Sequence, residues 1–169
     1  MMFTTKAEYG VRLLIELGRQ AQLEGTGTPV SLKAIADAEM LPLAYLERIV
    51  AKLKKAGFVE STRGAHGGYR LALDPAEIRM DEVIIALEGQ LRPMTCFASG
   101  ELQEADTEVA GARALCNHVG TGGHTCATKL LWTRVQGGIQ NALAGTTLAE
   151  LVDFALKNNP KAASGTAAA

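Results

Sequence analysis

Three cysteines are the residues of this chain best suited to chemistry, and all of them lie in one segment. That segment, residues 90–127, is rich in glycine and has no clear helical or strand period, and its cysteines are Cys96, Cys116 and Cys126. Free cysteines are often buried packing residues, but glycine-rich polar sequence is a poor place for a core. Because thiolates bind soft metals and react with oxidants, the segment indicates a metal site or a reactive sensor.

A disulfide framework suits these cysteines less well. Their number is odd, and the first residues, MMFTTKAEYG, lack the charged and apolar regions of a signal peptide. No apolar run approaches the ~20 residues that a membrane span needs. We therefore expect a cytoplasmic protein without a membrane partner, in which the cysteines are thiols or metal ligands.

The elements that must position this segment begin with a helix-turn-helix pattern. Apolar spacing predicts a helix over residues 4–20 and a short helix over 32–38, which has Ser31 as its N-cap. Pro42 can open the next helix at its first position, and Gly57 ends it. Two helices joined by a sharp turn suit the reading of duplex DNA.

A glycine-tipped hairpin follows these helices. Phe58 starts its first strand, and Tyr69, Leu71 and Leu73 alternate on its return strand. The predicted fold class is therefore mainly α with a small β-hairpin wing, that is, a winged helix-turn-helix.

The rest of the chain predicts three more helices. Asp74 has the form of a helix start, and the apolar helix after it stops at Gly89. A long helix is expected over 128–144 and a last one over 148–157, and Thr147 is the N-cap of that last helix.

Positive charge is concentrated on the hairpin and on the second helix of the helix-turn-helix, which we call the second reader helix. The whole chain has a net charge of −1, but six basic residues and one acidic residue lie between Arg48 and Arg70. These are the elements that would face phosphates. The sequence has no nucleophile elbow, phosphate loop or HExxH motif, so we expect neither an enzyme nor a small-molecule substrate. A protein-interaction adaptor is an alternative, although an adaptor has no need of a basic wing.

Three motifs carry a family resemblance that extends over residues 1–157. They are MFTTKAEYGVRLL, PLAYLERIVAKLKKAGFVESTRGAHGGYRLA and TTLAELV. The chain resembles the IscR/NsrR/RsrR family of bacterial iron–sulfur cluster transcription regulators. The resemblance implies a homodimer that pairs through the long helix 128–144 and binds a double-stranded DNA operator.

The same resemblance implies an iron–sulfur cluster on Cys96, Cys116 and Cys126. Nineteen residues separate the first two cysteines and nine separate the last two, a wide spacing closest to the RsrR type. That likeness favours a [2Fe–2S] centre over [4Fe–4S]. Where IscR supplies a histidine ligand, this chain has Lys129, which cannot serve.

The fourth ligand stays open among three residues, and water or no further ligand is the remaining alternative. By resemblance, Glu8 corresponds to a carboxylate supplied by the partner subunit, while His118 and His124 lie beside the cysteines. Glu8 could instead complete a capping box that starts at Thr5, and the histidines could be exposed loop residues. A thiol switch without a cluster is the alternative for the whole segment, and zinc is a further one.

The resemblance also implies which residues read DNA. Base edges are reached from the early turns of the second reader helix, and an arginine of the wing enters the minor groove. Arg48 stands where IscR has glutamine, and an arginine can bind guanine in bidentate fashion. Glu47 could accept from cytosine or pair with a neighbouring cation. The expected DNA contacts are Ala44, Tyr45, Glu47, Arg48, Lys52, Lys54, Arg63 and His66.

These expectations divide the chain into three parts. Residues 1–75 form the DNA-binding domain, 76–157 hold the cluster-binding loop and dimerisation helices, and 158–169 are a disordered tail. The predicted function is a regulator that senses redox state, nitric oxide or iron–sulfur status.

Overall fold

The computed structural model describes residues 3–25, 27–64, 67–92 and 127–158. The chain forms two compact units. One holds Phe3–Gly89 together with the chain from Leu143 onward, and the other holds Gln90–Ala142. Within the described ranges, no helix is long and apolar enough to cross a membrane.

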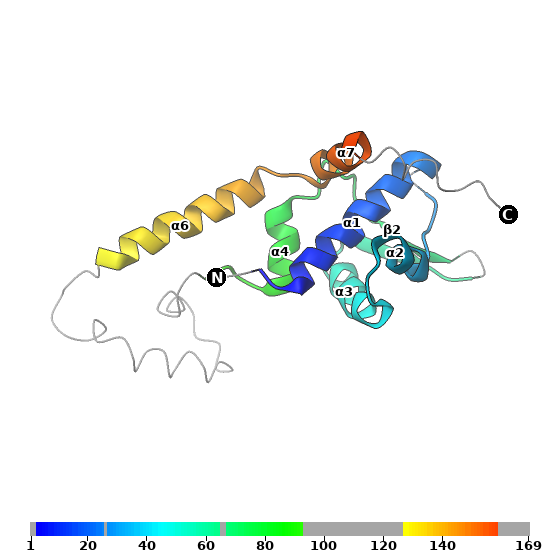
Figure 1. Ribbon diagram of the computed structural model, residues 1–169, viewed down its shortest axis with the longest axis horizontal. Coiled ribbons are helices and arrows are strands. Elements are labelled where there is room, and N and C mark those ends of the chain that lie inside the picture. The colour runs from blue at the N-terminus through cyan, green and yellow to red at the C-terminus, as the bar shows by residue number, and fades with distance from the viewer. Residues whose placement is uncertain (1–2, 26, 65–66, 93–126, 159–169) are drawn as a thin grey trace. The chain divides into compact units, whose positions relative to one another are not determined.

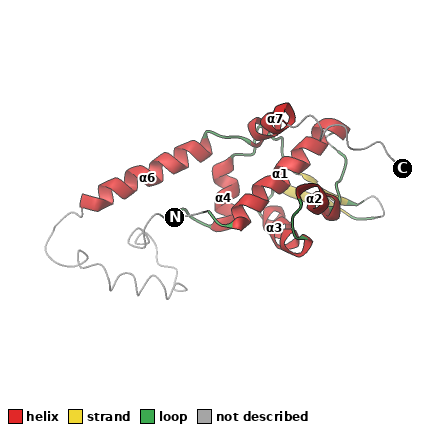
Figure 2. Cartoon of the chain, viewed as in Figure 1, coloured by secondary structure: helices red, strands yellow, loops and turns green. Residues whose placement is uncertain are grey.

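The first unit is mainly helical and carries one antiparallel hairpin (Figures 1 and 2). This agrees with the predicted fold class. Its elements are α1 (Thr5–Glu24), α2 (Leu32–Glu39), α3 (Leu43–Lys55), β1 (Val59–Thr62), β2 (Gly68–Leu71), α4 (Met80–Glu88) and α7 (Leu148–Asn158).

Helix α1 is the centre of this unit, because it contacts α2, α3, α4 and α7 (Figure 1). Its Leu13, Leu14 and Leu17 are fully buried in the core. The helix ends four residues later than the sequence predicted, because the first break comes at Gly25, whose φ of 101° a side chain rarely adopts.

The helix-turn-helix forms as predicted, with one shift at its second helix. The Ser31 hydroxyl accepts a hydrogen bond from the Ala34 amide at 3.1 Å and caps α2. In the turn, Met40 adopts the left-handed conformation with φ of 53°. Pro42 is the N-cap of α3 rather than its first residue.

Helix α3 ends in a Schellman motif. The Phe58 amide donates to the Leu53 carbonyl at 3.0 Å, and the Gly57 amide donates to the Lys54 carbonyl at 3.1 Å. Gly57 has φ of 85°, so the predicted role of this glycine in ending the helix is confirmed.

The wing follows directly. Strand β1 pairs with β2 in the register Val59↔Leu71 and Ser61↔Tyr69. Tyr69 also exchanges two backbone hydrogen bonds of 2.8 Å with Val30, which fixes the hairpin to the chain before α2. The return strand is shorter than predicted, because it ends at Leu71 and leaves Leu73 outside the ladder.

The predicted helix start at Asp74 is wrong. The Asp74 carboxylate accepts from the Ala76 amide at 2.8 Å, but this bond closes a local turn. Helix α4 begins six residues later, at Met80. Residues 75–77 form a turn, and the chain after them exchanges hydrogen bonds with the start of α7, where the Leu148 amide donates to the Ile78 carbonyl at 2.9 Å. Thr147 accepts from the Glu150 amide at 3.4 Å, so its predicted N-cap is confirmed.

The second unit is described over residues 90–92 and in most of α6 (Ala127–Ala144). The long helix predicted over 128–144 is therefore confirmed. Its Gln136 side chain donates to the Leu91 carbonyl at 3.0 Å. Leu130, Leu131 and Val135 are 60%, 55% and 38% exposed, so a long apolar face of α6 has no cover from the described chain.

Candidate nucleic-acid interface

The predicted base-reading residues share one exposed face of α3. Ala44, Glu47 and Arg48 are spaced by three and four residues, which places them together on a helix surface. All three are exposed, while Leu46 and Ile49 are buried on the opposite side. The helix therefore presents a polar face outward and fixes itself to the core by its other face.

The side chains of Glu47 and Arg48 are available for contact. Within the described part of the chain, neither makes a hydrogen bond or an ion pair through its side chain. The alternative in which Glu47 pairs with Arg48 or Lys52 does not occur in this structure. A free carboxylate and a free guanidinium on one face provide both an acceptor and a bidentate donor.

Tyr45 lies on a different side of α3 and is half-buried. Its ring meets the ring of Tyr9 of α1 edge to face, with centroids 5.6 Å apart and planes at 85°. The contact holds the start of α3 against α1. A DNA contact from Tyr45 stays a prediction.

The basic residues that were predicted to contact DNA have different surroundings. The Lys52 ammonium donates to the Leu87 carbonyl of α4 at 3.4 Å. The Lys54 ammonium donates to the Ser61 hydroxyl of the wing. Arg63 follows β1 and is exposed. The fourth residue, His66, lies outside the described residues.

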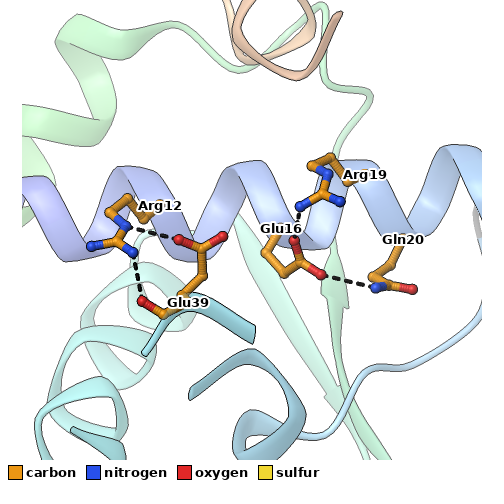
Figure 3. A network of polar contacts seen from close by, with 5 residues as sticks. All are labelled: Arg12, Glu16, Arg19, Gln20 and Glu39. Carbon is orange, nitrogen blue, oxygen red and sulfur yellow. Dashed lines mark hydrogen bonds and ion pairs between the residues drawn. The ribbon is translucent and has the colours of Figure 1, made fainter. Parts of the chain in front are cut away.

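The turn before α3 is held from α1. Arg12 donates through Nε to Glu39 Oε2 at 2.8 Å, and its Nη2 donates to the Glu39 carbonyl (Figure 3). One turn further along α1, a buried ion pair joins Arg19 to Glu16 at 2.6 Å, and Gln20 donates to the same carboxylate (Figure 3). No local pattern predicts the Arg12 contact, because 27 residues separate Arg12 from Glu39 along the chain.

Glu8 lies in the first turn of α1 and is exposed. The capping-box alternative is wrong, because Thr4 rather than Thr5 is the N-cap and its hydroxyl accepts from the Lys6 amide at 3.2 Å. The Glu8 carboxylate makes no hydrogen bond or ion pair to another described residue.

A second residue that caps α1, besides Thr4, is Glu88 of α4, which no sequence pattern predicted. Its carboxylate accepts from the Thr4 hydroxyl and from the Ala7 amide at 3.2 Å, and it pairs with Lys6 at 3.2 Å. The partners lie more than 80 residues away in the sequence, beyond the reach of any local pattern.

The remaining predicted ligands lie outside the described residues. They are Cys96, Cys116, Cys126, His118 and His124. The described ranges contain no group of three His, Cys, Asp or Glu residues that could hold a metal ion. The proposed ligand set therefore stays a prediction.

The fold and the exposed face of α3 define a winged helix-turn-helix protein of the DNA-binding class. The chain belongs to the Rrf2 family, described as iron-dependent transcriptional regulators, which it matches over residues 3–154. It is 34% identical over 152 residues to the transcriptional regulator IscR of Aliivibrio salmonicida, a match that covers 90% of this chain and 77% of the relative.

Solved structures show the same likeness. CymR of B. subtilis, the global cysteine regulator, matches with a TM-score of 0.67 and 32% identity over 91% of this chain and 98% of its own. IscR of T. potens matches with a TM-score of 0.67 and 30% identity, over 100% of this chain and 94% of its own. These relatives are named as regulators, in agreement with the expectation that this chain is not an enzyme.

Proposed function

We propose that this chain is a cytoplasmic transcription regulator that reads a DNA operator and senses redox state, nitric oxide or iron–sulfur status through a bound cluster. The observation that carries the DNA-reading half is the exposed face of α3, where Ala44, Glu47 and Arg48 lie together with free side chains. The family membership favours DNA over a protein partner for this face.

A homodimer is part of the proposal. The apolar face of α6, with Leu130, Leu131 and Val135 exposed, supports pairing of two copies along this helix. Two readers in one dimer would bind half-sites about one turn of DNA, roughly 34 Å, apart. The wing then adds Arg63 to each half-site.

The cluster would be held by Cys96, Cys116, Cys126 and Glu8. Glu8 fits a ligand role, because its carboxylate is exposed and has no partner in the described part of the chain. A bound cluster would supply reversible electron uptake and a site for ligand exchange. A [2Fe–2S] form is favoured over [4Fe–4S] by the resemblance of the cysteine spacing to the RsrR type, and the family description as iron-dependent supports an iron centre. His118 and His124 are the rival fourth ligands.

A thiol switch without a cluster is the second candidate. It is favoured by the likeness to CymR, whose name records a role as a cysteine regulator. In that case Cys96, Cys116 and Cys126 would act through their own oxidation.

Iron content and visible absorbance of anaerobically purified protein test the sensing half. We expect the triple variant Cys96→Ala/Cys116→Ala/Cys126→Ala to lose both. Glu8→Ala is expected to weaken the visible absorbance while helix content stays unchanged, and Glu24→Ala, an exposed acid at the other end of α1, serves as its control.

Three results would change the assignment. Wild-type iron in the triple variant would rule out these ligands. A silent Glu8→Ala together with spectral loss in His118→Ala or His124→Ala would move the fourth ligand to that histidine. Wild-type protein without iron, but with an operator affinity that oxidation changes, would favour the thiol switch.

A further inference from the structure

The last turn of α4 is the place where three helices of the DNA-binding unit meet. Its Leu87 side chain lies against Gly10 of α1, since a Cβ atom added at Gly10 would stand 2.3 Å from Leu87 Cδ1. The same added atom would stand 3.4 Å from Ile49 Cγ2 of α3. The apolar centre of this junction is therefore shared by α1, α3 and α4.

Glu88 bonds the last turn of α4 to the start of α1. Its side chain is only 13% exposed. It accepts from the Thr4 hydroxyl and the Ala7 amide, and it pairs with Lys6. The first amides of a helix have no partner within the helix, and the helix dipole favours a negative charge there. Glu88 supplies both the acceptor and the charge from a different helix.

Lys52 bonds the same turn of α4 to the reader helix α3. The Leu87 carbonyl lies in the last turn of α4, where carbonyls have no partner within the helix. The Lys52 ammonium donates to this carbonyl at 3.4 Å. Lys52 belongs to α3, so α3 is bonded to Leu87 of α4, while α1 is bonded to the next residue, Glu88.

The chain itself connects this turn to the segment that holds the cysteines. Gly89 ends one compact unit, and Gln90 begins the other. Six residues separate Gly89 from Cys96 along the sequence. Glu88 and Leu87 are therefore the residues of α4 nearest in sequence to that segment, apart from Gly89 itself.

We propose that Glu88 and Lys52 are positioning residues through which the state of the cysteine segment reaches the reader helix α3. The inference rests on the proposed sensing function for its input. It assigns Lys52 a role different from the phosphate contact that the sequence predicted. It also makes Glu88 more than a helix cap, because its bonds hold α1 against the turn of α4 that accepts a hydrogen bond from Lys52.

A double-variant cycle tests the role of Glu88. The probe is a duplex selected by the wild-type protein from a randomised library, and the readout is its dissociation constant by fluorescence anisotropy without oxygen. Each protein is measured with its cysteines intact and as Cys96→Ser/Cys116→Ser/Cys126→Ser. The control is Glu82→Gln, which removes an exposed acid from the same helix.

We expect the cysteine changes to shift the dissociation constant by about tenfold in the wild-type and Glu82→Gln backgrounds, a usual size for coupling between sites. In Glu88→Gln the shift is expected to fall below about threefold. An undiminished shift in Glu88→Gln would overturn the inference. If Glu88→Gln fails to fold, Lys6→Met breaks the same ion pair from the side of α1 and must reduce the shift in its place.

A second set of variants tests Lys52. In Lys52→Met we expect the cysteine-dependent shift to shrink while the salt dependence of DNA binding stays that of the wild type. Lys52→Arg, which can still donate to the Leu87 carbonyl, is expected to keep both. Lys55→Met, at an exposed lysine of the same helix, is the matched control. Two results together would make Lys52 a phosphate contact and refute its positioning role. They are a slope of log affinity against log salt concentration that falls by about one, and a cysteine-dependent shift in the dissociation constant that stays intact.

The cycle separates this inference from the function on which it rests. If the cysteine changes leave the wild-type dissociation constant unaltered, the proposed sensor fails and nothing remains for Glu88 to transmit. If they alter it equally in the wild type and Glu88→Gln, the sensor holds and only the positioning role fails.

Discussion

Arg48 is the side chain on which base selectivity of the proposed reader depends most. It is exposed beside Glu47 and makes no side-chain bond within the described part of the chain. We expect Arg48→Ala to lower affinity for a selected duplex by about 1–3 kcal/mol and to relax the preference at one G·C pair. Competition binding with duplexes altered at single positions measures both effects.

Lys55→Ala is the control for Arg48→Ala, because it removes an exposed positive charge from the same helix. We expect it to weaken binding to all sequences by a similar factor. If Arg48→Ala lowered specific and non-specific binding equally, Arg48 would be a phosphate contact and not a base reader.

Met40 shows how a single backbone angle shapes the turn before the reader. Its φ of 53° is the left-handed conformation, which costs an L-residue about 1–2 kcal/mol, and its side chain is 88% exposed. We expect Met40→Gly to raise the free energy of unfolding by up to about 1 kcal/mol, since glycine's greater freedom in the unfolded chain offsets part of the gain. Urea unfolding measures the change.

Met40→Ala separates the backbone effect from the loss of the side chain. Alanine meets the same penalty at φ of 53°, so its stability is expected to stay near that of the wild type. Equal stabilisation by glycine and alanine would mean that removal of the exposed thioether, and not the backbone, is responsible.

At the scale of elements, the close approach of α1 and α7 depends on a missing side chain. A Cβ atom at Gly18 would lie 2.5 Å from Val152 Cγ2, and Val152 is fully buried. We expect Gly18→Ala to destabilise the fold by about 1–3 kcal/mol through overpacking, despite the better helix propensity of alanine. Thermal and urea unfolding test this.

Two further variants check the cause of that loss. Val152→Ala returns space at the contact, so the double variant with Gly18→Ala is expected to lose less stability than the sum of the two single changes. Gly137→Ala on α6 meets no atom of the described chain within 4 Å, and only its helix propensity changes. Strict additivity at the α1–α7 contact would show that the two residues do not compete for space.

Sequence patterns predicted the ends of helices correctly where the hydrogen bonds that set those ends join residues close together in the chain. Ser31, Gly57 and Thr147 act within a few residues of themselves, and all three predicted roles were confirmed. The same logic failed at Asp74, because a carboxylate that accepts from an amide two residues on closes a turn as readily as it caps a helix. What decided that segment was its pairing with the start of α7, about seventy residues away along the sequence.

The candidate site divides in the same way. Helical spacing alone places Ala44, Glu47 and Arg48 on one face, and the resemblance implies that this face reads DNA. The contacts of Lys52 and Glu88 could not be predicted, because each joins two helices that only the tertiary fold brings together. The cysteine ligand set is implied by resemblance and lies outside the described residues.

At the scale of the whole molecule, Glu88 makes stability depend on pH. Burial raises the pKa of Glu88, but hydrogen bonds from Thr4, Lys6 and the Ala7 amide, together with the Lys6 charge, bring the pKa below its ordinary value of 4.5. A carboxyl group with a lowered pKa stabilises the fold above its unfolded pKa. That contribution disappears as the pH falls through the folded pKa.

We therefore expect Glu88→Gln to lose stability relative to the wild type at neutral pH and to converge with it in acid. The difference in unfolding free energy is expected to be constant above about pH 5.5 and to shrink below about pH 4.5, where the wild-type carboxyl group begins to take up a proton in the unfolded state. Urea unfolding at a series of pH values measures it. Glu82→Gln is the control, and a Glu88→Gln deficit that stays constant into strong acid would contradict the pKa argument.

Pairing of two chains through α6 is the largest-scale consequence of the proposal. Leu131 is 55% exposed on the apolar face of this helix. A glutamate there would bury a charge at the proposed interface, so we expect Leu131→Glu to sediment as a monomer. Gln140→Glu adds the same charge at an exposed polar position of α6 and is expected to remain dimeric.

Because a dimer engages two half-sites at once, Leu131→Glu is expected to lose about 10²–10⁴ in affinity for a two-half-site duplex and little for a single half-site. A Leu131→Glu protein that stayed dimeric would place the subunit interface elsewhere on the chain.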